Sequence, residues 1–185
     1  DKNAQNDPAQ IAQVPEKPYS ATSIAYPEPT TTISATATFN RYDDGASGLA
    51  AISTGLPIRY VEVHVLDSTG KQIQAGETNG TGSISLKIPR ASGSYTLRIN
   101  SRADNGFYRA SVLNNPYDNL YYSHDTSFSL AGNEVAANVS VAPAPATNAS
   151  NLLGGAFNIL DQIFVANEFI RTEGNKACPA GCTNT

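Results

Sequence analysis

Hydrophobic and polar residues alternate along most of the middle of the chain, the pattern of strands with one buried and one exposed face. In the first run, Ile33, Ala35, Ala37 and Phe39 alternate with Ser, Thr and Asn. Similar short runs follow at 61–66, 73–75, 84–88, 95–99, 108–112 and 135–141. No helical period separates them, so the pattern predicts antiparallel strands rather than alternating strands and helices.

Turn residues divide these runs about every ten residues. Asp67–Gly70 and Thr78–Gly82 carry Asp, Asn, Thr and Gly, and Pro89 ends the run before it. A further short hairpin is predicted around His124 and Asp125, joining Leu120–Tyr122 to Phe128–Leu130. The Gly/Ser/Ala-rich stretch 43–55 is predicted to overhang one end of the fold. Together these features predict an all-β fold, an antiparallel Greek-key β-sandwich of about seven strands.

The chain divides into five predicted segments. Residues 1–32 hold five of the eleven prolines and form an extended leader, and residues 33–142 form the β-sandwich. A Pro/Ala-rich linker follows over 143–151, then an apolar helix over 152–173 and a Cys-containing tail over 174–185.

The predicted helix is unusually apolar, with nine apolar residues among the fourteen of Phe157–Ile170. Its polar residues share a narrow stripe. Two interpretations follow: the helix packs across the sandwich of this chain, or it docks against another domain or a partner protein. The candidate docking residues are Phe157, Leu160, Phe164, Phe169 and Ile170. The segment is too short and too polar for a membrane span, which takes about 20 apolar residues.

Composition narrows the classes of partner and the cellular compartment. The chain has 12 Lys and Arg against 16 Asp and Glu, a net charge of −4, which argues against nucleic acid as a partner. It contains no Met and starts at Asp1, which we interpret as the mature form of an exported chain. The expected location is secreted or cell-surface, such as a bacterial lipoprotein or the periplasm. Cys178 and Cys182 are expected to form a disulfide there.

Catalytic motifs are absent from the sequence: it has neither a His-Glu-x-x-His zinc motif nor a Gly-x-Ser-x-Gly elbow nor a phosphate-binding loop. Glu62 and His64 lie on one face of a predicted strand, where a carboxylate can orient an imidazole, but a solvated strand face is the more common role of such a pair. With only two histidines in the chain, we expect a non-enzymatic protein without a cofactor.

Two sets of loop residues are candidate ligand sites. Asp43, Asp44, Asp104 and Asp118 fall in predicted loops and are candidate calcium ligands, although ordinary turns use the same residue types. Tyr117, Tyr121 and Tyr122 cluster beside an Asn-Asn-Pro turn and are candidate contacts for a sugar or a peptide, or else strand residues.

The run from Pro57 to Gly70, the Thr78-Asn-Gly80 turn with Gly82, and the Gly93-Ser-Tyr95 strand start resemble the carboxypeptidase regulatory-like domains. The resemblance covers residues 33–142 and implies a transthyretin-like β-sandwich, in which these positions build the fold and none is catalytic. Two departures are the longer 43–55 stretch and Asn79, which stands where the family usually has Asp.

The start of the helix, from Gly154 to Ile163, resembles the helix that leads from such a sandwich into a zinc-metallopeptidase-like domain in some secreted bacterial proteins. The function expected from the sequence is therefore a non-catalytic accessory module that positions or stabilises an adjoining domain, a metallopeptidase, through its C-terminal helix. The alternative is a free-standing surface adhesin or carbohydrate-binding module.

Overall fold

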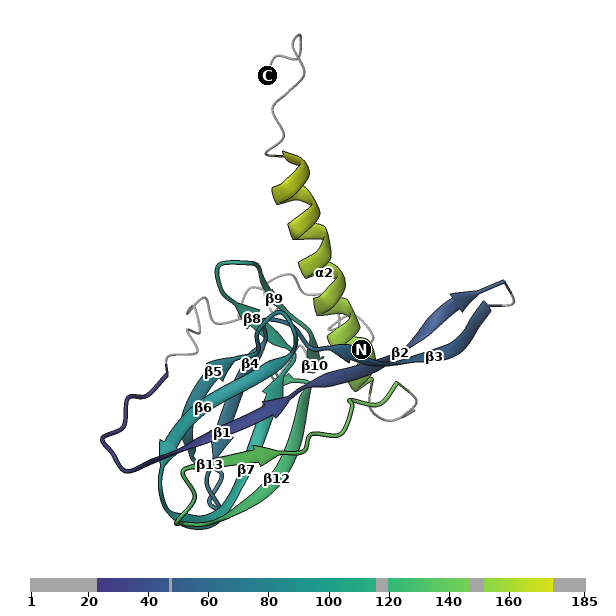
Figure 1. The fold of residues 1–185 in the computed structure, drawn as a ribbon. Helices are drawn as coiled ribbons and strands as arrows, with labels where there is room; N and C mark the ends of the chain where they lie inside the picture. The colour runs from purple at the N-terminus through teal and green to yellow at the C-terminus, as the bar shows by residue number, and fades with distance from the viewer. Residues whose placement is uncertain (1–22, 47, 116–119, 147–151, 175–185) are drawn as a thin grey trace, which may run out of the picture.

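The computed structural model describes residues 23–46, 48–115, 120–146 and 152–174. These residues form mostly β-strands in several sheets, followed by one C-terminal helix, as Figure 1 shows. The predicted all-β class with a C-terminal helix is therefore confirmed at this level. The helix, α2 (Leu153–Gly174), begins against the β body and ends away from it.

Two larger sheets make up the β body. One contains β13 (Ala136–Val139), β1 (Thr30–Thr36) and β6 (Ser83–Pro89), in that order, and its β1–β13 pair is parallel. The other is antiparallel and contains β12 (Ser123–Ala131), β7 (Ser92–Asn100), β4 (Glu62–Leu66) and β5 (Gln72–Glu77). Ile33 and Ile88 of the first sheet and Val63 and Leu97 of the second share one buried cluster.

Three two-stranded pairs complete the fold. They are β2 (Thr38–Gly45) with β3 (Gly48–Pro57), β8 (Arg102–Asp104) with β9 (Arg109–Ser111), and β10 (Leu113–Asn115) with β11 (Leu120–Tyr121). The β2–β3 hairpin projects beside the base of α2 (Figure 1).

The first predicted run, Ile33–Phe39, is divided between β1 and β2. At the break, the Ala37 amide donates to the carbonyl of Gly82 and the Ala37 carbonyl accepts from the amide of Ile58. The backbone of Ala37 therefore bonds to two other segments, and the chain changes from one sheet to another at this residue. The stretch 43–55, predicted as an overhanging insertion, is largely strand, because β3 pairs with β2.

The predicted hairpin at His124 and Asp125 is wrong. Both residues lie inside β12, which pairs with β7 without interruption from Ser123 to Ala131. Asp125 is held there by a two-point ion pair with Arg98 on the neighbouring strand, with N–O distances of 2.7 and 2.9 Å. A polar pair that looked like turn chemistry is thus a cross-strand pair on an exposed sheet face.

Two turns that carried the family resemblance have the same local structure. The Asp67 carboxylate accepts hydrogen bonds from the Thr69 amide, the Thr69 hydroxyl and the Lys71 amide. The Asn79 side-chain oxygen accepts the equivalent bonds from the Thr81 amide, the Thr81 hydroxyl and the Ser83 amide. Asn79 therefore makes every bond that Asp67 makes, because each bond uses a side-chain oxygen as acceptor.

Candidate functional site

The base of α2 is part of the core of this chain. Phe157 and Leu160 are each 1% exposed and Phe164 is 8% exposed, all in the same buried cluster as the sheets. Gly154 lies so close to the backbone oxygens of Asn40 and Pro145 that a side chain there would overlap them. Burial of three large side chains fixes the lower half of the helix on the β body.

Two arginines of the β body hold the helix in its orientation. The Arg59 guanidinium, between β3 and β4, lies 2.6 Å from the carboxylate of Asp161 and 4.6 Å above the ring of Phe164. On the β2 side, the Arg41 guanidinium donates to the side-chain oxygen of Asn158 at 3.2 Å. Both contacts come from the body, so they oppose rotation of α2 about its axis.

Aromatic rings surround Phe164. Its ring centroid lies 5.0 Å from that of Tyr60 and 5.9 Å from that of Tyr108, and the Tyr60 ring stacks on Phe107 at 4.0 Å. The Tyr108 hydroxyl donates to the carbonyl of Arg59, and burial raises the pKa of this phenol far above its ordinary value. Tyr108 is therefore a neutral packing residue with a satisfied hydroxyl.

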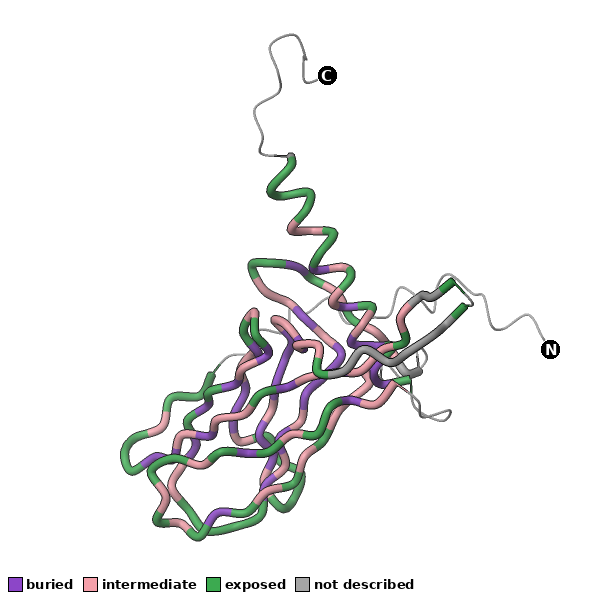
Figure 2. The backbone as a smooth tube through the Cα atoms, turned by 45° about the vertical axis from the view of Figure 1, so that its right-hand side comes forward, coloured by how far each residue is buried: buried purple, intermediate pink, exposed green. Residues whose placement is uncertain are grey.

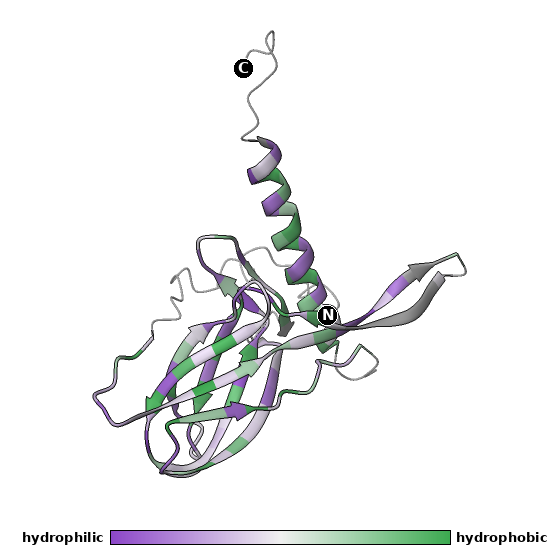
Figure 3. Cartoon of the chain, in the orientation of Figure 1, coloured by the Kyte–Doolittle hydropathy of each residue, from purple (hydrophilic) through white to green (hydrophobic). Residues whose placement is uncertain are grey.

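The apolar residues of the upper half of α2 are exposed, and the contact of this half with the body is made by Arg171, which donates to the Gly106 carbonyl at 3.4 Å and lies 5.5 Å from the ring centroid of Phe107. Phe169 is 66% and Ile170 is 65% exposed, and Val165 is also exposed. Ile159, in the lower half between the buried Phe157 and Leu160, is 50% exposed. Figure 2 shows the change from buried to exposed along the helix, and Figure 3 shows apolar residues continuing into the exposed half. Of the five predicted docking residues, the structure places three in the chain's own core and two on the free part of the helix. We define the exposed Ile159, Val165, Ala166, Phe169 and Ile170, together with the half-buried Ile163, as the distal apolar surface.

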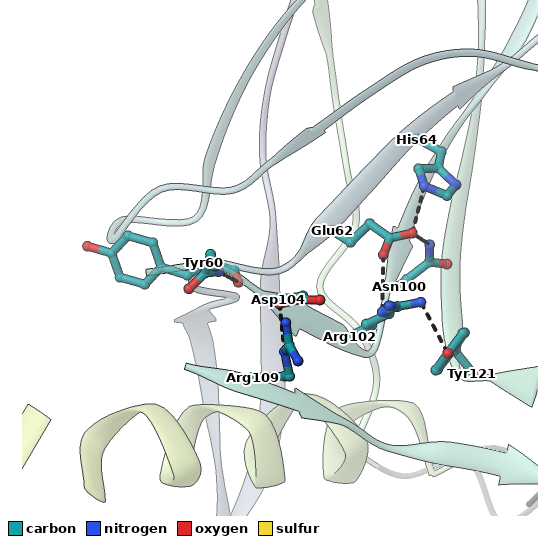
Figure 4. Close-up of polar contacts among 9 residues, drawn as sticks. Tyr60, Glu62, His64, Asn100, Arg102, Asp104, Arg109 and Tyr121 are labelled. Atoms are coloured by element: carbon teal, nitrogen blue, oxygen red, sulfur yellow. Dashed lines mark hydrogen bonds and ion pairs between the residues drawn. The ribbon is translucent and has the colours of Figure 1, made fainter. Parts of the chain in front are cut away.

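Glu62 is the centre of a buried polar network, drawn in Figure 4. Its carboxylate is 2.6 Å from Nε2 of His64, accepts a hydrogen bond from Asn100 at 2.8 Å and is 3.7 Å from Nε of Arg102. Arg102 in turn donates to the hydroxyl of Tyr121 at 3.2 Å. The predicted Glu62–His64 pair is therefore formed, but it is inside the fold, where it ties β4 and β7 to the segment after β7.

Of the predicted calcium ligands, the structure describes the side chains of Asp43 and Asp104, and each of them pairs with an arginine. Asp43 lies in β2 beside Arg41, and Asp104 lies in β8 with its carboxylate 2.8 Å from Nε of Arg109. Within the described ranges there is no group of three or more acidic, His or Cys side chains arranged for a metal ion. The side chain of Asp44 and the residue Asp118 lie outside what the structure describes.

The tyrosine candidates are only partly described. Tyr121 is half-buried, and the Arg102 guanidinium lies 5.4 Å from its ring centroid, whereas Tyr122 packs against the core cluster. Tyr117, Cys178 and Cys182 lie outside the described residues, so the ligand contact at Tyr117 and the disulfide stay predictions.

A shallow groove runs over the outer face of β7 and β12 at the β4–β5 turn, with a volume of about 390 Å³. The groove is lined by the hydroxyls of Ser94, Thr96 and Ser127 and by the Arg98–Asp125 pair.

Among the described helices, none is long and apolar enough to cross a membrane.

The hydrophobic periodicity of the sequence does not identify Arg59, Tyr60 and Phe107 as residues of this site. Arg59 and Asp161 are 102 residues apart, and no local pattern marks a pair at that separation. Tyr60 has a positive φ of 53°, which is rare for a tyrosine and is not signalled by a neighbouring glycine. These residues become visible only once the helix is placed on the body.

No protein-family model and no curated protein matches this sequence. Among solved structures, a 9R-lipoxygenase from Cyanothece PCC8801 is similar, with a TM-score of 0.39 and 14% sequence identity. The similar region covers 73% of this chain and 20% of the lipoxygenase chain.

Proposed function

We propose that this chain is a non-catalytic accessory module of an exported or surface protein, which holds α2 so that its distal apolar surface contacts an adjoining domain. The observation that carries the proposal is the contrast within one helix. Phe157, Leu160 and Phe164 anchor it in the body, whereas Phe169 and Ile170 are about two-thirds exposed. Such exposed apolar residues on a rigid element are typical of a docking surface.

The finer description of the fold is also part of the proposal. We interpret the two larger sheets as a Greek-key sandwich of the transthyretin type, related to carboxypeptidase regulatory-like domains. The seven strands of these sheets and the common core support it. The adjoining domain is then a metallopeptidase, as the resemblance of the helix start implies. Sequencing the native reading frame past Thr185 tests this, because a His-Glu-x-x-His segment is expected there.

The docking role is tested by the double variant Phe169→Ser with Ile170→Ser in the full native polypeptide. We expect the adjoining domain to melt at a lower temperature in calorimetry, while the chain of residues 1–185 alone melts unchanged, because both side chains are already in water. Val135→Ser is the matched control, since Val135 is 67% exposed but lies in the β body. Equal melting of the double variant and the native polypeptide would exclude the docking role.

The alternative, a carbohydrate-binding module, has its best support in the groove beside Arg98 and Asp125. A fixed carboxylate next to a guanidinium offers an acceptor and donors side by side, which suits adjacent sugar hydroxyls. Loss of glycan-array binding in Arg98→Ala would place the glycan in the groove, whereas loss in Tyr121→Ala would place it at the tyrosine region. A native chain that binds no glycan would eliminate this alternative.

A further inference from the structure

The two larger sheets meet at β5 and β6, each of which is the last strand in the order of its sheet. Such an edge strand has main-chain N–H and C=O groups without a partner strand on its outer side. At this border the groups bond instead to side chains and to residues 23–29, the purple segment that enters β1 in Figure 1. We define Ile73, Gln74, Ala75 and Lys87 as the edge site.

The side chain of Gln74 acts in place of a partner strand. It is 0% exposed, and its Oε1 accepts hydrogen bonds from the amides of Ile24 at 2.7 Å and Ala75 at 2.9 Å. Its Nε2 donates to the carbonyls of Ile24 at 2.9 Å and Lys87 at 2.5 Å. The carboxamide thus uses both N–H groups and both acceptor positions. Bonding to the N–H and the C=O of one residue is also what a strand does in an antiparallel pair.

The segment 23–29 is held mainly through its main chain. Only Tyr26 in this segment is half-buried, and the other side chains, including that of Ile24, are exposed. The Tyr26 hydroxyl donates to the carbonyl of Ile73, and the Pro29 carbonyl accepts from the amide of Arg90 at 3.1 Å. Peptides that add to a sheet edge bind in the same manner, since main-chain hydrogen bonds supply affinity and a few side chains supply specificity.

We propose that the edge site is a binding site for an extended peptide, and that residues 23–29 are its ligand, bound within the same chain. The site belongs to β5 and β6, whereas the ligand precedes β1. The contacts therefore depend on the main chain of Ile24 and the hydroxyl of Tyr26, and they do not depend on the covalent link to β1. A separate peptide with a tyrosine two residues after the bonded amide fits the same contacts.

The full chain with Ile24→Pro tests the site, because proline lacks the amide hydrogen that Gln74 accepts and the edge site itself is unchanged. The probe is a labelled synthetic peptide of residues 21–29, titrated against this chain and the native chain by fluorescence anisotropy. We expect at least about tenfold tighter binding to the Ile24→Pro chain, because the attached segment competes at high effective concentration in the native chain. Hydrogen exchange of residues 23–29 reports whether the attached segment has left the edge.

Two N-methylated peptides are matched controls. Methylation at Ile24 removes the bonded amide hydrogen and should weaken binding at least about tenfold, since it leaves a buried acceptor without its donor. Methylation at Ala25 should change binding little, because that amide bonds to none of the residues that the structure describes. Tyr26→Phe in the full chain is a milder variant that removes only the hydroxyl bond to Ile73. It should increase both hydrogen exchange of the segment and affinity for the peptide.

Three results would overturn the proposal. If the attached segment leaves the edge but the peptide does not bind at up to about 1 mM, residues 23–29 are a part of the fold and not a ligand. If the segment of the Ile24→Pro chain stays as protected from exchange as in the native chain, Gln74 does not hold it. If both N-methylated peptides bind equally well, the site does not recognise the main chain of Ile24.

Discussion

Gly70 and Gly82 both have positive φ, at 82° and 75°, but their surroundings differ. A side chain at Gly70 would meet no atom within 4 Å, whereas one at Gly82 would overlap the backbone oxygen of Ala37. We expect Gly70→Ala to cost about 1 kcal/mol from left-handed backbone alone. Gly82→Ala should cost roughly 2–4 kcal/mol, because overpacking adds to that term. Urea denaturation of both variants measures the difference, and equal losses would contradict the close approach at Gly82.

Glu77 and Glu134 should respond to pH in opposite ways. Burial raises the pKa of Glu77 above 4.5, with nearby Asp104 and Glu62 adding to the shift, whereas hydrogen bonds from backbone amides, that of Ala131 first, lower the pKa of Glu134. A raised carboxyl pKa means that the unfolded chain ionises first, so Glu77 lowers stability as pH rises above 4.5. A lowered pKa means that Glu134 stabilises the fold above 4.5, and this contribution is lost as pH falls.

The glutamine variants test this pair of shifts. Glu77→Gln should raise the melting temperature at pH 7, with the gain disappearing below about pH 4, where both states are protonated. Glu134→Gln should lower the melting temperature at pH 7, and this decrease should also become smaller in acid. Thermal unfolding followed by circular dichroism from pH 3 to 8 gives both profiles. A gain for Glu77→Gln that persists unchanged at pH 3 would show that its effect is not ionisation.

At the scale of the element, two of the three phenylalanines of α2, Phe164 and Phe169, form a matched pair. Phe164 is 8% exposed among Tyr60, Phe107 and Tyr108, and Phe169 is 66% exposed. We expect Phe164→Ala to destabilise residues 1–185 by about 3 kcal/mol, from lost burial and a cavity. Phe169→Ala should change the free energy of unfolding by less than about 0.5 kcal/mol. Chemical denaturation decides it, and a comparable loss at Phe169 would mean that the distal half also packs on the body.

Elements with a clear local pattern were predictable, and those fixed by distant partners were not. The β4–β5 hairpin follows from Val61–Leu66 and the Asp67–Gly70 turn, and the helix from Phe157–Ile170. β3 has little alternation, since six of its ten residues are Gly, Ala, Ser or Thr, and it is a strand because β2 pairs with it. His124 and Asp125 look like a turn because polar residues occupy turns and exposed strand faces alike.

At the scale of the whole molecule, the sequence pattern does not determine which apolar residues of the candidate site are buried. The apolar excess of α2 is evident in the sequence, but the division of that surface between body and exterior is not. It depends on Arg59 and Asp161, and on rings from the β3–β4 and β8–β9 connections that meet Phe164. Helical periodicity indicates how many apolar residues must be buried, but it does not indicate which neighbouring element buries them.

The same division predicts how the chain tolerates truncation. Residues 1–150 lack Phe157, Leu160 and Phe164, whose burial contributes about 2 kcal/mol each, a large part of the stability of an ordinary domain. We expect that chain to melt at least about 10 °C below residues 1–185, or to lose its cooperative transition. Residues 1–167 keep all three side chains and lack Phe169 and Ile170, so they should melt within a few degrees of the parent. Calorimetry of the three chains under one buffer condition makes the comparison. If residues 1–150 unfold cooperatively at the parent temperature, the base of α2 is not part of the core, and the helix cannot act as a fixed support for an adjoining domain.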